Sequence, residues 1–420
     1  MRRPGASVRA VGALSHLRIC DFTGQLAGAG ATKWLAAFGA QVIRIEDPVT
    51  KGRWDILRGS PPFKDERRGI EFGAGFQNHN VEKLGITLNV RTDRGKELLA
   101  ELVRRSDAVT ENFAAGVVER WGFGYPRLRE LRPDIVYVSN CGFGQTGPYG
   151  SFKSWGPIAQ AVSGLTFTSG LPDEDPAGWG YSFMDHTGGY MMAIAILMAL
   201  YHRARTGEGQ WVDLSCTEAG ATLHGPAMLD SEVNGRPMRR PGSPNSNRNA
   251  WPAMAPHGIY PGAGDDEWIA ISCRDDAEWT ALRAVAGAAL PDRAAWSTLR
   301  GRLDDQDALD TAMRAWTQGC DRFETAAALR AAGVAAAPVR RPGERIDGDP
   351  ATGAWPLWPT VAHGAMGDVR VDGLPVHLTE TDWSMTTGAP LLGEHNDVVY
   401  GELLGLSSSE IDDLRAEGVI

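Results

Sequence analysis

The sequence predicts an α/β protein with a doubly wound, Rossmann-like parallel sheet domain and a second, smaller α/β domain. Strand-like and helix-like stretches alternate over residues 17–234, which is typical of a parallel sheet covered by helices. A shorter alternation over 265–341 follows a stretch rich in Pro, Gly, Asn and Ser. With 420 residues, 43% of them apolar and 22% charged, the chain is long enough to bury two separate cores.

The opening segment predicts a strand, a helix and a second strand. An apolar run at 17–22 is followed by helical spacing at 29–38 and by the alternating segment QVIRIE at 41–46. A turn at 24–30 connects the first strand to the helix. This order predicts a βαβ unit, in which two parallel strands share one sheet.

The next residues continue the alternation. A helix is predicted at 92–105, with strands at 107–110 and 135–139. Because ligands of doubly wound sheets bind at the carboxyl ends of the strands, we expect the site in the loops that follow them. These loops come after Phe22, Glu46, Glu111 and Ser139.

A long apolar helix is predicted over 185–205, followed by the turn TGEGQ at 206–210 and a strand at 211–214. Its longest apolar run, 190–200, is far shorter than the roughly 20 residues that a membrane span requires. We therefore interpret it as a buried helix and expect no membrane-spanning segment.

Turn residues and composition divide the chain into six predicted parts. The last part contains two short helices split at 407–409, where Ser408 or Ser409 would cap the second helix. The parts are a loose N-terminal tail at 1–16, a large Rossmann-like domain at 17–234, a connecting loop at 235–264, a small α/β domain at 265–341, a linker at 342–389, and C-terminal helices at 390–420 that return to the large domain.

Composition excludes several classes of protein. The net charge of −10 is spread along the chain without a basic block, so no nucleic-acid partner is expected. The five cysteines are scattered and never form a CxxC pair, which argues against a disulfide framework and a zinc site. Cys141 and Cys216 follow strand-like stretches, which leaves a nucleophilic thiol conceivable. Residues 1–16 lack the apolar core of an export signal, so we expect a cytoplasmic protein.

Asp185 is the main candidate for chemistry. It stands in FMDHTGG, directly before the long apolar helix, and for an isolated aspartate at this place a helix N-cap is the commoner explanation. A helix start also favours an ionised carboxylate, which is a competent nucleophile toward a thioester. Gly188 and Gly189 would leave room for a substrate, and His186 is either a proton-transfer group or structural.

The turn TGQLAGAG follows a strand and opens a helix, but it lacks the GxGxxG spacing of a dinucleotide fingerprint. Its glycines permit either a close phosphate or tight strand-to-helix packing. Near the expected site loops, Arg91, Arg120 and Lys153 could pair with phosphates, although each alone is more often a surface charge.

Seven segments occur in the order found in one family. The chain resembles the class III CoA-transferases, the CaiB/BaiF family, which includes formyl-CoA and carnitine CoA-transferases and related acyl-CoA racemases. The segments are DFTGQLAG at 21, FGAQVIRIE at 38, LNVRTDRGKELL at 88, ENFAAGVVERWGF at 111, GFGQTGPY at 142, MDHTGGYMMAIAILMALYHRARTGEGQWVDLS at 184, and PLLGEHNDVVYGELLGLSSSEIDDL at 390.

The resemblance implies that Asp185 carries the acyl group and that acyl-CoA and a carboxylic acid are the substrates, with no tightly bound cofactor and no metal. It also implies a homodimer of two interlocked chains. The residues that match the family's CoA contacts are Gln25, Ala27, Leu88, Asn89, Arg91, Asn112, Phe113, Ala114, Arg120 and Lys153.

The chain departs from the family pattern in three places. Asp47 stands where relatives have an arginine, so a phosphate contact there would move to Arg44, Lys51 or Arg53. SPNSNRNAWPAMAP at 243–256 replaces a glycine-rich loop, which disfavours oxalate-type substrates.

The segment 155–165 contains no histidine of the kind that the racemases use, which disfavours racemisation. An acyl-CoA racemase and a CoA-binding subunit of a heteromeric transferase remain the alternatives. Trp155, Trp179 and Trp251 would suit a large or aromatic acid, if they are not core residues.

Overall fold

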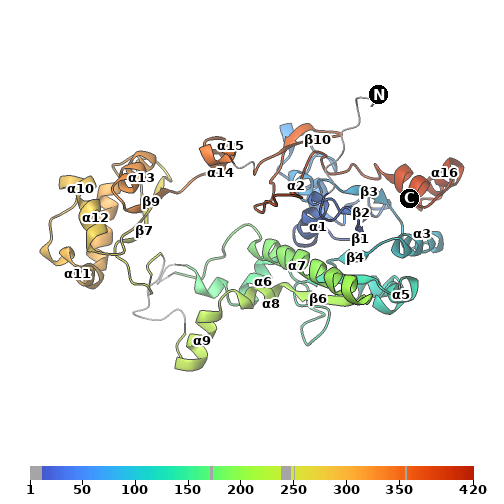
Figure 1. Ribbon diagram of the computed structural model, residues 1–420, viewed down its shortest axis with the longest axis horizontal. Coiled ribbons are helices and arrows are strands. Elements are labelled where there is room, and N and C mark those ends of the chain that lie inside the picture. The colour runs from blue at the N-terminus through green and yellow to red at the C-terminus, as the bar shows by residue number, and fades with distance from the viewer. Residues whose placement is uncertain (1–11, 171–173, 238–246, 250, 355–356) are drawn as a thin grey trace. The chain divides into compact units, whose positions relative to one another are not determined.

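The computed structural model describes residues 12–170, 174–237, 247–249, 251–354 and 357–420, which form two compact units (Figure 1). The second unit is inserted into the sequence of the first. The first unit takes its described residues from Met1–Leu165, Gly178–His224 and Gly353–Ile420, and the second from Thr166–Ala177 and Gly225–Thr352.

The first unit is built on a six-stranded sheet in the order β3-β2-β1-β4-β5-β6, with every neighbouring pair parallel. This order confirms the predicted doubly wound sheet. Strands β1 and β4 are neighbours although helices and two strands separate them in sequence, so the strand order reverses between them, where such sheets bind ligands. The strands are β1 Arg18–Asp21, β2 Gln41–Glu46, β3 Leu84–Thr87, β4 Ala108–Glu111, β5 Val136–Cys141 and β6 Trp211–Ser215.

Helices cover both faces of this sheet, as its buried strands require. On one face, α1 and α7 pack on Ile19, Val42 and Val136. On the other, α3 and α16 pack on Ile43 and Val109. The helices of the unit are α1 Ala27–Ala37, α2 Ala74–His79, α3 Asp93–Arg104, α4 Val117–Arg120, α5 Tyr125–Leu131, α6 Gly156–Val162, α7 Phe183–Thr206, α8 Cys216–Thr222 and α16 Ser408–Ala416, with the 3₁₀ turns η1 Ile56–Gly59 and η2 Lys64–Glu66 and the π-helix η6 Asp397–Leu403.

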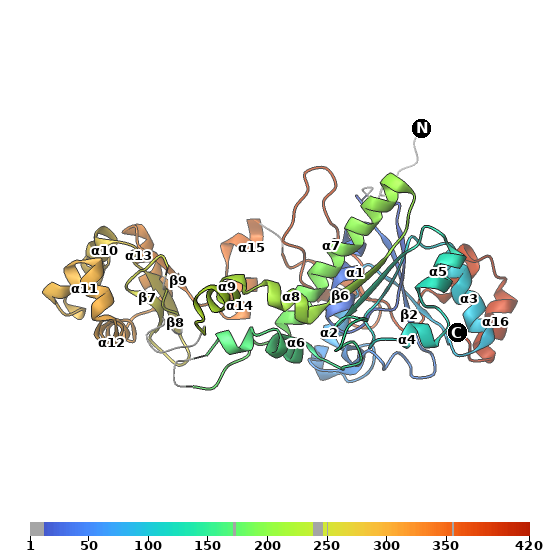
Figure 2. The ribbon, with the colours of Figure 1, turned by 90° about the horizontal axis from the view of Figure 1, so that it is seen from below.

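Helix α7 is the one helix, among the described residues, that is long and apolar enough to cross a membrane by length and composition. Figure 2 shows it lying along the sheet. Met192, Ile196 and Ala199 on it are buried against the sheet and α1, whereas its opposite face is exposed, so the predicted buried helix is buried on one side only.

The C-terminal segment covers the outer edge of β3. The backbone N–H of Thr87 donates to Asn396 Oδ1 (2.9 Å), and the N–H of Asn89 donates to the Val419 carbonyl (2.7 Å). Two helices do occur near the C-terminus, but the N-cap of α16 is Ser407, whose side chain and Glu410 form a capping box. The prediction of Ser408 or Ser409 as the cap was therefore wrong, because the helix starts one residue earlier.

The range 342–389, predicted as a linker, contains regular structure. Its short helices are α14 Pro342–Asp347 and α15 Pro350–Ala354, and its antiparallel hairpin pairs β10 Thr360–His363 with β11 Gly367–Arg370. These elements are too short to show a period in the sequence.

The second unit has a three-stranded antiparallel sheet in the order β7-β8-β9. Its core gathers Tyr260, Ile269 and Ile271 from the strands with Trp296 and Met313 from the helical side. Strand β7 lies in the range predicted as a connecting loop. The elements are β7 His257–Pro261, β8 Trp268–Ser272, β9 Ala335–Pro338, α9 Gly225–Asn234, α10 Asp276–Ala286, α11 Leu299–Asp304, α12 Gln306–Thr317 and α13 Arg322–Ala331, with 3₁₀ turns η3 Thr166–Thr168, η4 Gly287–Ala289 and η5 Ala294–Ser297.

Candidate active site

Asp185 is the third residue of α7, not its N-cap as the sequence suggested. The helix already begins at Phe183, because the Ser182 carbonyl accepts from the N–H groups of Asp185 (2.8 Å) and His186 (3.2 Å). Ser182 has φ 49° and makes no side-chain cap. The Asp185 carboxylate is thus free of capping and lies in the first turn, where the helix dipole favours a negative charge.

The Asp185 carboxylate is seated against the backbone of Gly156, the first residue of α6. A Cβ on Gly156 would lie 1.8 Å from Asp185 Oδ2. Burial raises the pKa of Asp185, while Ser182, His186 and the Gly156 N–H act in the opposite direction. Because burial outweighs these contacts, the site holds a carboxylate that is poorly solvated and therefore reactive.

Gly188 and Gly189 allow close packing of helices and do not leave room for a substrate, contrary to the expectation above. A Cβ on Gly188 would lie 2.5 Å from Cys216 Sγ, and one on Gly189 would lie 2.6 Å from the carbonyl oxygen of Ala27. This second contact brings the turn between β1 and α1 against the helix that carries Asp185.

Neither candidate thiol is suited to nucleophilic attack. Burial raises the pKa of Cys216 to about 12 and that of Cys141 to about 11. The Cys216 thiol instead donates to Asn140 Oδ1 (3.2 Å). His186 is half-buried among the rings of His79, Tyr181 and Tyr190, and burial lowers its pKa.

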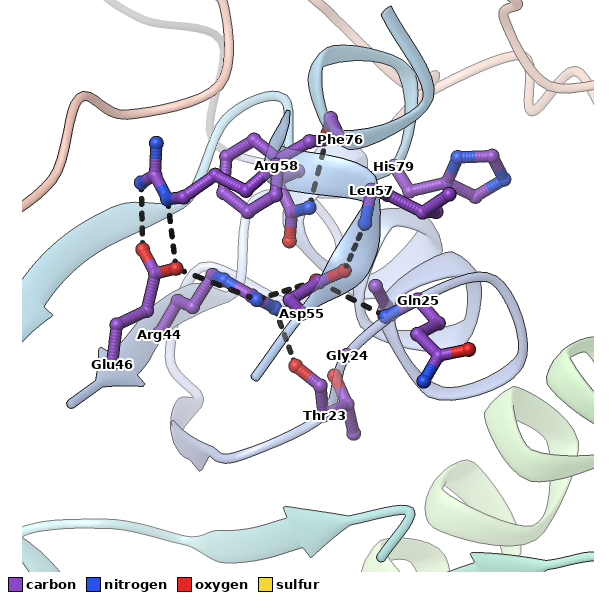
Figure 3. Close-up of polar contacts among 12 residues, drawn as sticks. Thr23, Gly24, Gln25, Arg44, Glu46, Asp55, Leu57, Arg58, Phe76 and His79 are labelled. Carbon is purple, nitrogen blue, oxygen red and sulfur yellow. Dashed lines mark hydrogen bonds and ion pairs between the residues drawn. The ribbon is translucent and has the colours of Figure 1, made fainter. Parts of the chain in front are cut away.

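The turn between β1 and α1 is held from two sides. On one side, Gly24 N–H donates to Asn112 Oδ1 (2.7 Å), and Asn112 Nδ2 donates back to the Gly24 carbonyl (3.0 Å). On the other, Asp55 accepts from the Gln25 N–H, and Arg44 binds both Asp55 and the Thr23 carbonyl (Figure 3). The side-chain amide of Asn112 is therefore occupied by the turn.

A cavity of about 150 Å³ opens at the carboxyl ends of β1 to β4. Four predicted residues line it, namely Leu88, Asn89, Arg91 and Phe113. The remaining wall is formed by Phe22, Ile45, Glu46, Asp47, Thr50, Trp54, Val90 and Trp121. Ring contacts join Phe22 to Trp121 (5.6 Å), Trp121 to Phe113 (5.3 Å) and Phe113 to Trp54 (5.2 Å), so one side of the cavity is a continuous aromatic surface.

The other predicted residues lie outside this cavity. Ala114 and Arg120 are exposed on the segment after β4, and Lys153 is exposed on the loop after β5. Gln25 belongs to the turn between β1 and α1, and Ala27 is the first residue of α1, where its carbonyl lies against Gly189 of α7.

Arg44 cannot replace the missing arginine at position 47, because it is fully buried beneath the turn. Lys51 and Arg53 are exposed, and Asp47 itself lines the cavity. Of the three cations named as replacements, only Lys51 and Arg53 are therefore accessible to a phosphate.

Two site residues were missed from the sequence. Glu111, the last residue of β4, is buried and accepts from Phe113 N–H (2.7 Å) and Gln145 Nε2 (3.2 Å), so it joins the loops after β4 and β5. Burial raises its pKa to about 7. Its place at the end of a buried strand was a usable signal. Asp55 lies in an irregular segment and gave no signal.

The chain is similar to known proteins over nearly its whole length. The model of the family "CoA-transferase family III" matches residues 14–396. Formyl-CoA:oxalate CoA-transferase of Streptomyces coelicolor is 33% identical over 97% of this chain and 99% of its own length. Succinyl-CoA:mesaconate CoA-transferase of Haloarcula marismortui is 32% identical over 96% and 100%. The crystal structure of a CaiB/BaiF family protein from Brucella suis has a TM-score of 0.83 at 28% identity, covering 93% of this chain and 99% of that one.

Proposed function

Because the chain belongs to CoA-transferase family III and is a CoA-transferase, we propose that it moves CoA from an acyl-CoA donor to a carboxylic acid through covalent intermediates on Asp185. The observation that carries this proposal is the half-buried carboxylate in the first turn of α7, seated against Gly156 and beside the turn that contains Gln25.

The proposed reaction needs four balanced steps. The Asp185 carboxylate attacks the donor thioester carbonyl, the C–S bond breaks, and CoA thiolate leaves a mixed anhydride on the enzyme. The thiolate then attacks the Asp185 carbonyl carbon and releases the donor acid, which leaves an aspartyl-CoA thioester. The acceptor carboxylate attacks this thioester, giving a second anhydride and thiolate. The thiolate finally attacks the acceptor's acyl carbon and restores the Asp185 carboxylate.

The first unit supplies the proposed CoA site. The cavity lined by Phe113 and Trp121 has room for one flat ring system of the nucleotide, with Leu88, Asn89 and Arg91 beside it. A purine ring stacks favourably on aromatic side chains such as these. In this proposal Arg120, exposed at the end of α4, and Lys153, exposed on the loop after β5, bind phosphates, and backbone N–H groups near the start of α7 stabilise the developing oxyanions.

A homodimer is part of the proposal. One face of α7 exposes an apolar stripe with helical spacing, which a lone chain would leave in water. Its members are Tyr190, Met191, Ile194, Leu197, Met198 and Tyr201. A second copy of the chain, interlocked with the first, would cover this stripe. The five free cysteines suit a reducing compartment, and we propose the cytoplasm.

The test uses trapping of the intermediate. The protein is incubated with formyl-, succinyl- or acetyl-CoA and then with hydroxylamine, and the modified peptide is identified by mass spectrometry. We expect a hydroxamate on Asp185 alone and no transfer by Asp185→Asn. The matched control is Glu218→Gln, because Glu218 is an exposed carboxylate at the same position of the first turn of α8. Full transferase activity in Asp185→Asn would refute the mechanism.

The same assay separates the alternatives. Incorporation of solvent deuterium at the α-carbon without an acceptor acid would indicate a racemase. Inactivity of the pure protein, relieved by a paralogous chain, would indicate one subunit of a heteromer. The latter has a precedent among the relatives, since the succinyl-CoA–L-malate CoA-transferase beta subunit of Chloroflexus aurantiacus is 28% identical over 97% of this chain.

A further inference from the structure

The turn between β1 and α1 contains a backbone conformation that its own residue does not favour. Gln25 has φ 55°, in the left-handed region, where a residue with a Cβ is uncommon. The backbone torsion angles of a residue set the direction of its side chain. The contacts that stabilise the left-handed backbone of Gln25 therefore also determine where its carboxamide points.

We propose that Asp55 is a positioning residue, which fixes the left-handed backbone of Gln25 and thereby directs the Gln25 carboxamide at the bound acyl-CoA. The inference rests on the proposed function, in which the turn contacts the substrate, and assigns to Asp55 no contact with substrate.

The Asp55 carboxylate accepts three hydrogen bonds that hold the turn, and we call this arrangement the Asp55 clamp. Its Oδ2 accepts from the Gln25 N–H (3.0 Å) and from Arg44 Nη2 (2.7 Å), and its Oδ1 accepts from the Leu57 N–H (3.1 Å) (Figure 3). The Asp55 side chain is fully buried. A buried carboxylate that accepts several hydrogen bonds, one from a cation, is held in a single orientation.

Arg44 ties the clamp to the other end of the turn. Its guanidinium donates to the Thr23 carbonyl as well as to Asp55, and it lies over the ring of Phe76 at 4.9 Å. Arginine stays charged in proteins, so the guanidinium needs the carboxylate beside it. The ion pair therefore fixes the backbone on both sides of Gly24, from Thr23 to Gln25.

The Gln25 side chain itself is free to act. Figure 3 shows its carboxamide on the opposite side of the backbone from Asp55. It has no hydrogen-bond partner among the residues that the structure describes, and it is half-buried. Two residues later, the Ala27 carbonyl touches Gly189, one helical turn after Asp185. The turn thus presents an uncommitted amide next to the helix that carries the nucleophile.

The substitution Asp55→Asn tests the clamp, since an amide keeps the size of the carboxylate but removes its charge and half of its acceptors. We expect kcat to fall about tenfold, with the donor KM changed less than about threefold, because misdirected groups reduce the rate more than binding. Gln25→Ala should show a similar loss. The double variant should lie within about twofold of Gln25→Ala, because Asp55 then has nothing left to direct.

The control is Glu71→Gln. Glu71 binds the neighbouring buried Arg58 (2.7 Å) but makes no contact with the turn, and it should leave the kcat of both the native chain and Gln25→Ala unchanged. Losses of Asp55→Asn and Gln25→Ala that multiply in the double variant, or an unaffected Asp55→Asn, would overturn the assignment.

If Asp55→Asn does not fold, the proposal is tested by combining it with Gln25→Gly. Glycine adopts positive φ without cost, so Gln25→Gly should restore folding of Asp55→Asn and give the same kcat as Gln25→Gly alone. Failure of this double variant to fold would show that Asp55 is a general structural support, and would overturn the proposal. Absence of any hydroxamate on Asp185 in the native protein would instead refute the proposed function, so the two failures are distinguishable.

Discussion

The Asp185 carboxylate and the α-carbon of Gly156 leave no space between them for a side chain, since a Cβ on Gly156 would lie 1.8 Å from Oδ2. We therefore expect Gly156→Ala to displace the carboxylate and to lower kcat/KM at least about a hundredfold, with the fold intact by circular dichroism. Gly59→Ala is the control, because nothing lies within 4 Å of its Cβ position. Unchanged turnover in Gly156→Ala would mean that Asp185 does not react from this position.

The raised pKa of Asp185 predicts an acid limit on activity. The nucleophile must be ionised, and burial raises its pKa, so kcat/KM should fall with decreasing pH at a pH above that at which a free aspartate titrates, about 3.9. The profile is measured with a stable donor between pH 4 and 8. Glu218→Gln should show the same limb as the native chain. A rate constant that stays flat down to the pH of a free carboxylate would contradict the assignment.

The raised pKa of Glu111 predicts that the folded protein becomes less stable as pH rises. Its pKa is about 7 in the folded protein and close to the ordinary 4.5 in the unfolded chain, so between these values the unfolded state loses the proton first. The folded state then becomes less favoured as pH increases from about 4.5 to 7, by roughly 3 kcal/mol in the free energy of unfolding.

Glu111→Gln removes this titration, so its free energy of unfolding should fall less between pH 5 and 8 than that of the native chain. Urea unfolding at both pH values measures the difference. Glu402→Gln is the control, because it removes the same charge from an exposed position that does not influence the pKa of Glu111. Parallel pH dependence in Glu111→Gln and the native chain would refute the prediction.

The position of Phe113 in the cavity wall predicts that its removal weakens CoA binding and leaves the chemical steps unchanged. Removing its ring opens the aromatic side of the cavity, and base–aromatic stacking is worth about 1–3 kcal/mol, so Phe113→Ala should raise the Kd for free CoA at least about fivefold. Saturating kcat should change little. Calorimetry with CoA checks the first point. Phe72→Ala, which removes a ring that contacts Arg67 and does not line the cavity, should bind CoA normally.

The apolar stripe on α7 predicts the oligomeric state. Met198 is 67% exposed and Ile194 53% exposed, so a charge at either position would be buried in the proposed dimer. We expect Met198→Glu to elute as a monomer in light-scattering chromatography. Val376→Glu, at an exposed valine outside α7, should stay dimeric. If the native chain were monomeric, the stripe would need another partner.

The sheet could be predicted because its strands and helices are regular and alternate. The other strands could be recognised from the sequence, and the parallel order followed from the helical connections, but β3 Leu84–Thr87 was not predicted because four residues are too few to show a period. Short elements such as β10 and β11 carry too few residues to show a period. The prediction of Asp185 as the N-cap was wrong because Ser182 occupies the N-cap position three residues earlier, in a left-handed conformation and without a side-chain capping hydrogen bond.

Site residues could be predicted only where they belong to a recognisable sequence motif. Leu88, Asn89 and Arg91 come from one segment and Phe113 from another, and the four meet at one cavity. Asp55, in contrast, lies in an irregular segment 30 residues after Gln25 and acts through a hydrogen bond to backbone. Such a contact depends on the folded path of the chain, and no residue type or spacing reveals it.

The cover on the outer edge of β3 has a consequence for biosynthesis. Asn396 and Val419 satisfy the backbone groups of Thr87 and Asn89, more than 300 residues away in the sequence. A nascent chain therefore displays an unprotected parallel edge while the ribosome completes the inserted unit, and such edges recruit other strands. The segment that contains Asn396 and Val419 is synthesised after the inserted unit, so the edge of β3 is closed only after that unit has been translated.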